Sequence, residues 1–288
     1  MRVRSDLAAL GAVFLWGSLA TLAALLSHLP PLLLTGIGLL IGALVSLPLA
    51  RFDFKRLKVS RTALAVGVYG LFGYHAALFA GLQNAPSVQA NLVNYLWPLL
   101  IVVLAPLLIP GTKLTLKHVI AAITGFVGAG MAILSGAELV SGFAVGYVFA
   151  FVAAIFFSTY SLLSKRVEFQ TTGVGTFGFV SGALAILAHL IFEPATTIQL
   201  ADWPLLIALG LGPLGGSFYL WVYALKTGNP QRVGLIAFLT PLISTTMLLL
   251  VTETPLSPLL VLSAVLIIAA AVFGSRGNQG VNNKAHVS

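Results

Sequence analysis

Long apolar stretches alternate with short polar ones along the whole chain, and this pattern defines the expected elements. A helix of about 20 apolar residues crosses the hydrocarbon core of a bilayer. Segments rich in Pro, Gly or charge punctuate the sequence between such stretches. The pattern predicts an all-α integral membrane protein with ten transmembrane helices, at about residues 7–26, 32–49, 62–82, 88–109, 118–134, 143–164, 173–192, 204–225, 233–252 and 257–273.

The charges agree with this count. Only 8% of the residues are charged, whereas about 25% are charged in a soluble domain. If the N-terminus is cytoplasmic, all 15 Lys and Arg residues fall in inside segments, and the outside loops hold only Glu138, Glu193, Asp202 and Glu253. Because basic residues stay on the cytoplasmic side, both termini are expected there, in a multi-pass protein. The net charge of +8 therefore sets orientation, and the expected partner is the lipid bilayer, with no nucleic acid.

The ten helices divide into two sets of five. Residues 73–98 align with residues 216–241 at a constant offset of 143, which matches Pro98 with Pro241. Since five is odd, the second set enters the membrane from the opposite side. Two five-helix inverted repeats around a central cavity are typical of transporters, whose substrate site lies near the midplane.

This division sets the expected domains. Residues 1–137 form the N-terminal five-helix repeat, residues 138–275 form the C-terminal inverted repeat, and residues 276–288 form a disordered tail rich in polar residues.

One stretch inside the fourth span is unusually polar. Asn91, Asn94, Tyr95 and Pro98 share one helical face, and Pro98 has no N–H to give to the carbonyl of Asn94. A break at this depth is tolerated only against protein or a water-filled cavity. The stretch indicates a substrate pathway, with contact between helices as the alternative. Pro98 and its counterpart Pro241 are candidate hinges, although a transmembrane proline can also act as a simple kink.

The spans hold almost no ionisable groups. No Asp, Glu, Lys or Arg lies well inside any of them, and only His75 and His189 remain. Intramembrane charges mark proton relays and ion pathways, so carboxylate-based proton coupling, cationic drugs and phosphorylated substrates are disfavoured. The chain has no Cys, no metal-ligand spacing and no cluster of catalytic residues. We expect no enzyme activity, no cofactor and no metal. A structural membrane subunit is the alternative of another class, and a midplane cavity would argue against it.

The run Asn94-Tyr95-Leu96-Trp97-Pro98, together with Phe14-Leu15-Trp16-Gly17-Ser18, resembles the drug/metabolite transporter superfamily. Its EamA-type members, and among them the YddG-type aromatic amino acid exporters, are the most similar. The resemblance covers essentially the whole chain. It implies location in the bacterial inner membrane and export of aromatic and other apolar amino acids. It also implies a cavity lined by spans 1–4 and 6–9, with spans 5 and 10 peripheral.

Aromatic and neutral polar side chains are what such a cavity can offer a zwitterion. We expect Trp16, Tyr95 and Trp97 to contact the side chain of the cargo. We expect Asn91 and Asn94 to bind its polar end. Interfacial anchoring of Trp and Tyr, and packing of His75, are the alternatives. The candidate substrate-binding residues are Trp16, Tyr74, His75, Asn91, Asn94, Tyr95, Trp97, Phe157, Tyr160 and Phe218.

The expected function is export by alternating access, with a broad-specificity EamA metabolite or drug exporter as the alternative. The absence of a membrane carboxylate favours facilitated diffusion or exchange, and proton coupling through His75 is left open. A monomer suffices, because the two halves supply both sides of a cavity, and a dimer is allowed.

Overall fold

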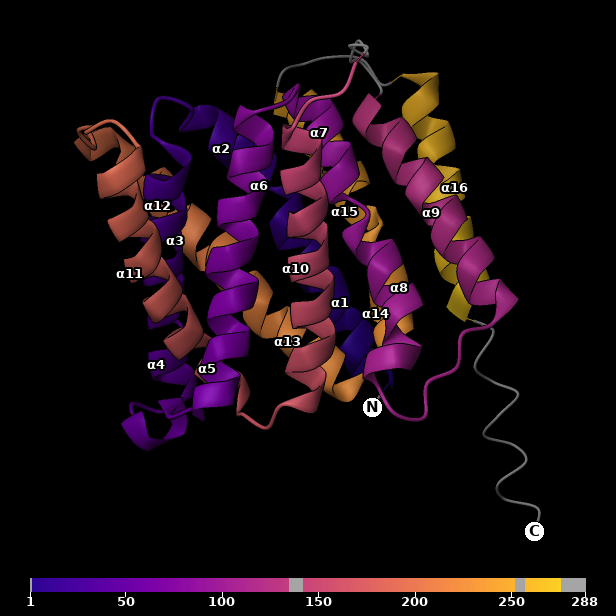
Figure 1. Cartoon of the computed structure of the whole chain (residues 1–288), viewed down its shortest axis with the longest axis horizontal. Coiled ribbons are helices and arrows are strands. Elements are labelled where there is room, and N and C mark those ends of the chain that lie inside the picture. The colour runs from indigo at the N-terminus through magenta and orange to yellow at the C-terminus, as the bar shows by residue number, and fades with distance from the viewer. Residues whose placement is uncertain (1, 135–141, 252–256, 276–288) are drawn as a thin grey trace.

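The computed structural model describes residues 2–134, 142–251 and 257–275, and all regular structure in these ranges is helical (Figure 1). The expected boundary at 137/138 and the expected tail 276–288 lie outside the described residues. The first part of the chain contains α1 (Arg2–Gly17), α2 (Leu19–Leu25), α3 (Pro31–Leu44), α4 (Ser46–Leu49), η1 (Phe54–Leu57), α5 (Arg61–Val68), η2 (Tyr69–Gly73), α6 (Tyr74–Gln83), α7 (Ser87–Asn94), α8 (Trp97–Leu108) and α9 (Leu116–Leu134). The second part contains α10 (Gly146–Arg166), η3 (Thr171–Gly173), α11 (Val174–Phe192), η4 (Leu200–Asp202), α12 (Trp203–Leu211), η5 (Gly212–Gly216), α13 (Ser217–Thr227), α14 (Pro230–Ala237), α15 (Leu239–Val251) and α16 (Pro258–Ser275).

Within the described residues, eight helical stretches are long and apolar enough to cross a membrane, so the chain is a multi-pass membrane protein. They agree with the first eight expected spans to within a few residues at each end. The ninth expected span is divided at Phe238 into α14 and α15, and the tenth is the shorter apolar helix Pro258–Gly274. The eight spans are Val3–Leu25, Pro31–Leu49, Arg61–Gln83, Val88–Leu108, Leu116–Leu134, Gly146–Arg166, Thr171–Phe192 and Leu200–Thr227.

Several spans are interrupted, and the interruptions recur at one spacing. The π-helices η2 and η5 begin at residues 69 and 212, which are 143 positions apart. The short helices α7 and α14 begin at residues 87 and 230 and end at residues 94 and 237, again 143 positions apart. A π-turn in a helix marks a local change in hydrogen bonding and is frequent at functional sites. The spacing expected from the prolines is thus repeated in the backbone.

The helices pack in a consistent order across the molecule. Helix α9 lies along α16 at one side, and α3 lies against α11 and α12 at the other (Figure 1). Between them, α1 contacts α13, and α10 contacts α6, α7 and α8. Most of the buried apolar side chains form a single cluster in this middle region, while a smaller one lies under α9 and α16. The interrupted spans therefore meet at the centre of the protein.

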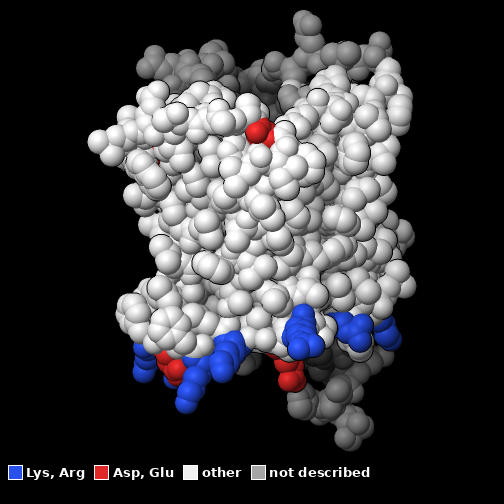
Figure 2. Space-filling model, turned by 60° about the vertical axis from the view of Figure 1, so that its left-hand side comes forward, with Lys and Arg blue, Asp and Glu red and all other residues white. Residues whose placement is uncertain are grey.

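Charge is segregated along the direction of the helices. Figure 2 shows Lys and Arg side chains gathered at one end of the visible face, and a belt without charge above them. We call the end of the molecule that carries these Lys and Arg side chains the basic end. A depression at this end is lined by the cations Lys58, Lys165, Arg166 and Lys226. An apolar belt between charged or polar ends is what a bilayer-spanning protein requires.

Candidate functional site

An aromatic cluster occupies the centre of the protein, and Trp16 lies in its middle. The Trp16 ring centroid is 5.1 Å from that of Trp221, 5.6 Å from Phe157, 5.8 Å from Phe218 and 6.0 Å from Trp97. Most of these pairs are edge-to-face, the arrangement that the ring quadrupoles favour. Tyr74 joins through Phe157, at 4.8 Å between centroids. We define the aromatic cluster as Trp16, Tyr74, Trp97, Phe157, Phe218 and Trp221.

The breaks in the helices explain why these rings converge. Trp16 is next to the end of α1, where the Ser18 hydroxyl donates to the Leu15 carbonyl at 2.7 Å. Trp97 is the first residue of α8, and Tyr74 directly follows the π-helix η2. Phe218 is the second residue after the second π-helix. Each of these four rings therefore lies within two residues of an interruption in its span.

One polar pair lies beside the aromatic cluster. The Asn94 side-chain amide donates through Nδ2 to the Tyr74 hydroxyl at 3.4 Å. Asn94 is buried, and its Oδ1 has no hydrogen-bond partner among the described residues. A buried acceptor without a partner costs about 1–3 kcal/mol. Such an atom is suited to a donor that arrives from outside the protein.

His75 is held by its own helix. Its Nδ1 lies 2.6 Å from the Leu71 carbonyl oxygen, inside the π-helix. Since a carbonyl only accepts, Nδ1 carries the proton, and Nε2 of the neutral ring is an acceptor. His75 is 4% exposed and its ring centroid is 6.3 Å from that of Phe218. His75 therefore lies at the edge of the aromatic cluster, and its hydrogen bond goes to the Leu71 carbonyl of the π-helix η2.

The other sequence candidates lie around this centre. Tyr160 is fully buried, and its hydroxyl has no partner among the described residues. Its ring occupies the place that a Cβ at Gly70 would need, so it packs against the π-helix. Asn91 and Tyr95 are half-buried on α7 and at its end. Tyr160 contacts the aromatic cluster only through Phe157, at 6.0 Å between ring centroids. No ring contact joins Tyr95 to the aromatic cluster among the described residues.

Trp221 is not among the candidate residues named from the sequence, and a Trp near the end of a span is often an interfacial anchor. The structure instead buries it completely, and its indole Nε1 donates to the Ser161 hydroxyl at 3.0 Å. Its spacing of three residues from Phe218 puts both on one helical face. That spacing was the sequence feature that could have assigned it to the site.

The two prolines lie just after the corresponding breaks. Helix α7 ends at Asn94 and α8 begins at Trp97, so Pro98 falls in the first turn of α8. A proline is tolerated there, because the N–H it lacks has no helical partner. Helix α14 ends at Ala237 and α15 begins at Leu239, which puts Pro241 in the first turn of α15. The breaks themselves lie two to three residues before each proline.

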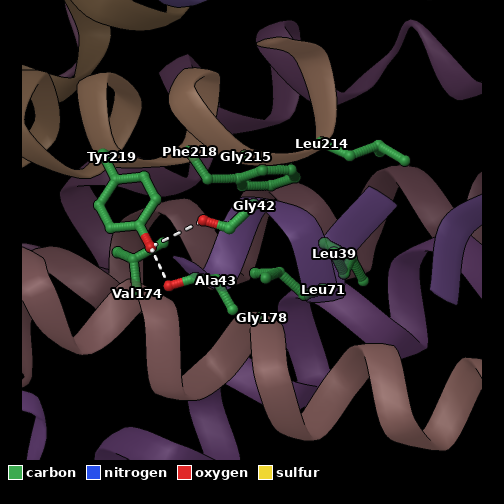
Figure 3. A pocket seen from close by; sticks show the side chains of 10 residues that line it. All are labelled: Leu39, Gly42, Ala43, Leu71, Val174, Gly178, Leu214, Gly215, Phe218 and Tyr219. Carbon is green, nitrogen blue, oxygen red and sulfur yellow. Dashed lines mark hydrogen bonds between the residues drawn. The ribbon is translucent and has the colours of Figure 1, made fainter. Parts of the chain in front are cut away.

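A small cavity lies to one side of the aromatic cluster, between α3, α11, η5 and α13 (Figure 3). Its volume is about 10 Å³, enough for one water at most. The Tyr219 hydroxyl lies at its wall, 3.1 Å from the Gly42 carbonyl oxygen, to which it donates. This cavity is too small for a solute. At the centre itself the rings of the aromatic cluster contact one another, so in this conformation side chains fill the expected substrate position.

Two histidine–carboxylate pairs connect elements at the end opposite the basic end. Glu193 accepts from the backbone N–H groups of Leu32 and Leu33 at 2.8 and 3.2 Å, and from His189 Nδ1 at 2.9 Å. It therefore caps the first turn of α3 from the end of α11. His28 lies 3.2 Å from Asp202. Nothing in the sequence indicates the contacts of Glu193 with α3 and of His28 with Asp202, since these partners are more than 150 residues apart.

In the described part of the chain, no group of three or more His, Asp or Glu side chains is placed to hold a metal ion. What the site offers a ligand is aromatic surface, amide and hydroxyl groups, and no full charge.

Comparisons with known proteins identify the family of the chain. The sequence profile of the EamA-like transporter family matches the chain twice, at residues 3–134 and 144–276. The aromatic amino acid exporter YddG of Ancylobacter novellus is 36% identical over 269 residues, which cover 90% of this chain and 93% of the exporter. The YddG exporter of Salmonella typhimurium is 27% identical over 59% of this chain and 61% of its own length.

One uncharacterised relative and one solved structure extend the comparison. The uncharacterised transporter YyaM of Bacillus subtilis is 24% identical over 74% of this chain and 72% of its own length. One crystal structure superimposes with a TM-score of 0.86 at 33% identity, covering 94% of this chain and 97% of the other chain. The named relatives are transporters and not enzymes, and the resemblance to the EamA-type and YddG-type proteins is confirmed.

Proposed function

Because the chain belongs to the EamA-like transporter family, we propose that it exports aromatic and other apolar amino acids across the bacterial plasma membrane. The observation that carries this proposal is the aromatic cluster beside a buried, unpartnered amide oxygen. Rings suit an aromatic or aliphatic side chain, and a neutral acceptor suits an ammonium group. The name of the relative from Ancylobacter novellus supports the same cargo.

The architecture we propose is ten transmembrane helices in two inverted five-helix repeats. The recurrence of π-helices and helix breaks 143 residues apart supports it. The two family matches, one in each half, support it as well. In this arrangement α14 with α15 is the ninth span and α16 is the tenth, and the positive-inside rule places the basic end and both termini in the cytoplasm.

Within the site we assign separate roles to the rings and the amides. Trp16 and Trp97 contact the apolar part of the cargo, together with Phe157 and Phe218. Asn94 Oδ1 accepts from the cargo's ammonium while its Nδ2 stays on Tyr74. The outer part of the proposed site consists of Asn91, Tyr95, His75 and Tyr160. The absence of full charges among these residues keeps binding weak, which suits a protein that must release what it binds.

Alternating access follows from the same elements. The rings now contact one another, so cargo binding requires the two halves to separate around the aromatic cluster. The breaks before Pro98 and Pro241, and the two π-helices, are where the spans can bend. Corresponding breaks in both halves allow equivalent motions on the two sides of the membrane.

Counterflow in proteoliposomes tests the proposal. Vesicles loaded with unlabelled Phe should accumulate labelled Phe transiently. Vesicles loaded instead with unlabelled Trp, Tyr, Leu or Ile should also accumulate labelled Phe. Empty vesicles give the baseline. If structurally unrelated metabolites abolish the counterflow of labelled Phe as well as apolar amino acids do, the broad-specificity exporter is favoured. If no apolar amino acid supports counterflow, the proposed cargo is contradicted.

A further inference from the structure

The basic end holds a depression that the transport site does not use. It has a volume of about 620 Å³, and its wall includes Lys58, Lys165, Arg166, Lys226, Glu168 and Phe169. We propose that this basic depression is an entrance subsite that receives the carboxylate of the cargo before the cargo reaches the aromatic cluster. The inference rests on the proposed function and on the cytoplasmic position of the basic end.

The depression has an excess of positive charge. Four cations and a single carboxylate line it. None of the ion pairs formed by described residues includes Lys58, Lys165, Arg166 or Lys226. Several like charges in a concave site focus the potential and raise the local concentration of the opposite charge. The carboxylate of an amino acid is the anion that an exporter of amino acids meets there.

Two of the cations are fixed by crossed contacts between helix ends. Lys165, at the end of α10, donates to the carbonyl of Leu225 in the last turn of α13 and to that of Gly228 just beyond it, at 2.7 and 2.8 Å. Lys226, at the end of α13, donates to the Val167 carbonyl beyond α10 at 3.0 Å and lies 3.9 Å from the centroid of the Phe169 ring. A lysine ammonium has three N–H donors, so Lys226 keeps donors for an arriving carboxylate.

The same two helices lead from the depression to the transport site. On α10, Ser161 is one turn before Lys165 and accepts from the Trp221 indole. One further turn along is Phe157, a member of the aromatic cluster. The basic depression and the aromatic cluster are therefore successive levels of one α10–α13 interface.

The surroundings favour a solute over a lipid headgroup. The half of α10 nearest the depression is enclosed, and Ser158, Ser161 and Ser164 are all fully buried. Ala224 and Leu225 on α13 are also fully buried. The parts of α10 and α13 next to the depression are therefore packed against protein and not against lipid. Since no cation lies among the rings, the entrance is where the carboxylate finds positive charge.

The test uses two exposed cations that make none of the crossed contacts. In inverted membrane vesicles, Lys58→Gln/Arg166→Gln should raise the KM for Phe roughly three- to tenfold with little change in kcat, which corresponds to the loss of two solvated charges. The KM for phenylalaninamide, which lacks the carboxylate and is a net cation, should not rise. High salt should reduce the difference between variant and wild type for Phe. Arg51→Gln/Arg61→Gln is the control, because it removes equal charge from exposed residues outside the depression.

Three results would overturn the inference. Equal KM changes for Phe and its amide would show that the carboxylate is not recognised. Equal effects in the control pair would assign the effect to general surface charge. An effect that follows the phosphatidylglycerol content of reconstituted vesicles, for both solutes alike, would assign the depression to lipid phosphate. In each case wild-type transport of Phe persists, whereas failure of the wild type to move Phe would remove the proposed function together with this inference.

Discussion

The Asn94 side chain donates through Nδ2 to the hydroxyl of Tyr74 at 3.4 Å, while Oδ1 of the same amide is buried with no partner among the described residues. The hydrogen bond orients the amide, so that its acceptor is held beside the rings of the aromatic cluster. The protein keeps an unfavourable group in place at the position where the proposed cargo presents its ammonium.

The first prediction concerns this trade between stability and function. We expect Asn94→Leu to change thermal stability in detergent little, because removing an acceptor whose burial costs about 1–3 kcal/mol is offset by leaving the Tyr74 hydroxyl without its Asn94 donor. Transport of Phe should fall by at least tenfold in kcat/KM, since the ammonium loses its acceptor. Parallel unfolding curves and counterflow rates check both parts. A variant with unaltered transport would contradict the role of Asn94.

The second prediction concerns the cap on α3. Glu193→Ala removes the carboxylate that accepts from the backbone N–H groups of Leu32 and Leu33 and that pairs with His189. Because the Glu193 side chain is only 5% exposed, we expect a loss of about 1–3 kcal/mol in unfolding free energy. Asp53→Ala is the control, since its ion pair with Arg56 is 47% exposed on each side and should contribute less than about 1 kcal/mol. Equal losses in the two variants would refute the assignment.

The third prediction concerns the contact between α3 and the second π-helix. A Cβ at Gly42 would lie 2.6 Å from the Gly215 Cα and 2.9 Å from the Gly210 carbonyl oxygen. Since both are backbone atoms, Gly42→Ala must push η5 away and should destabilise the protein by about 1–3 kcal/mol. Gly130→Ala is the control, because its new methyl would meet only a Leu92 side-chain methyl, at 3.2 Å. Thermal unfolding that ranks the two in the opposite order would contradict the packing.

The sequence predicted the helices well because bilayer thickness leaves little freedom in their length. The ends of Gly146–Arg166 and Arg61–Gln83 fall within a few residues of the expected spans. The break at Asn94 followed from the proline and the polar face. The π-helices η2 and η5 did not, since no residue type specifies an i→i+5 turn, although Gly at residues 70, 73, 215 and 216 allows the close packing seen there.

The composition of the site was harder to predict than its location. Trp16, Trp97, Phe157 and Phe218 were chosen as mid-span aromatic residues, and the structure brings their rings together. Trp221 completes the aromatic cluster, although a Trp near the end of a span is also typical of an interface. The caps made by Glu193 and Lys165 depend on contacts between distant segments, which a single sequence does not reveal.

The central claim is that the cargo binds among the rings around Trp16. Counterflow of labelled Phe by Trp97→Ala, in proteoliposomes with protein content matched to wild type, tests it most directly. Trp203→Ala is the matched control, because Trp203 is 41% exposed and makes none of the ring contacts of the aromatic cluster. We predict that Trp97→Ala lowers the Phe rate at least tenfold and that Trp203→Ala retains it. Equal rates for wild type and a folded Trp97→Ala would contradict the account.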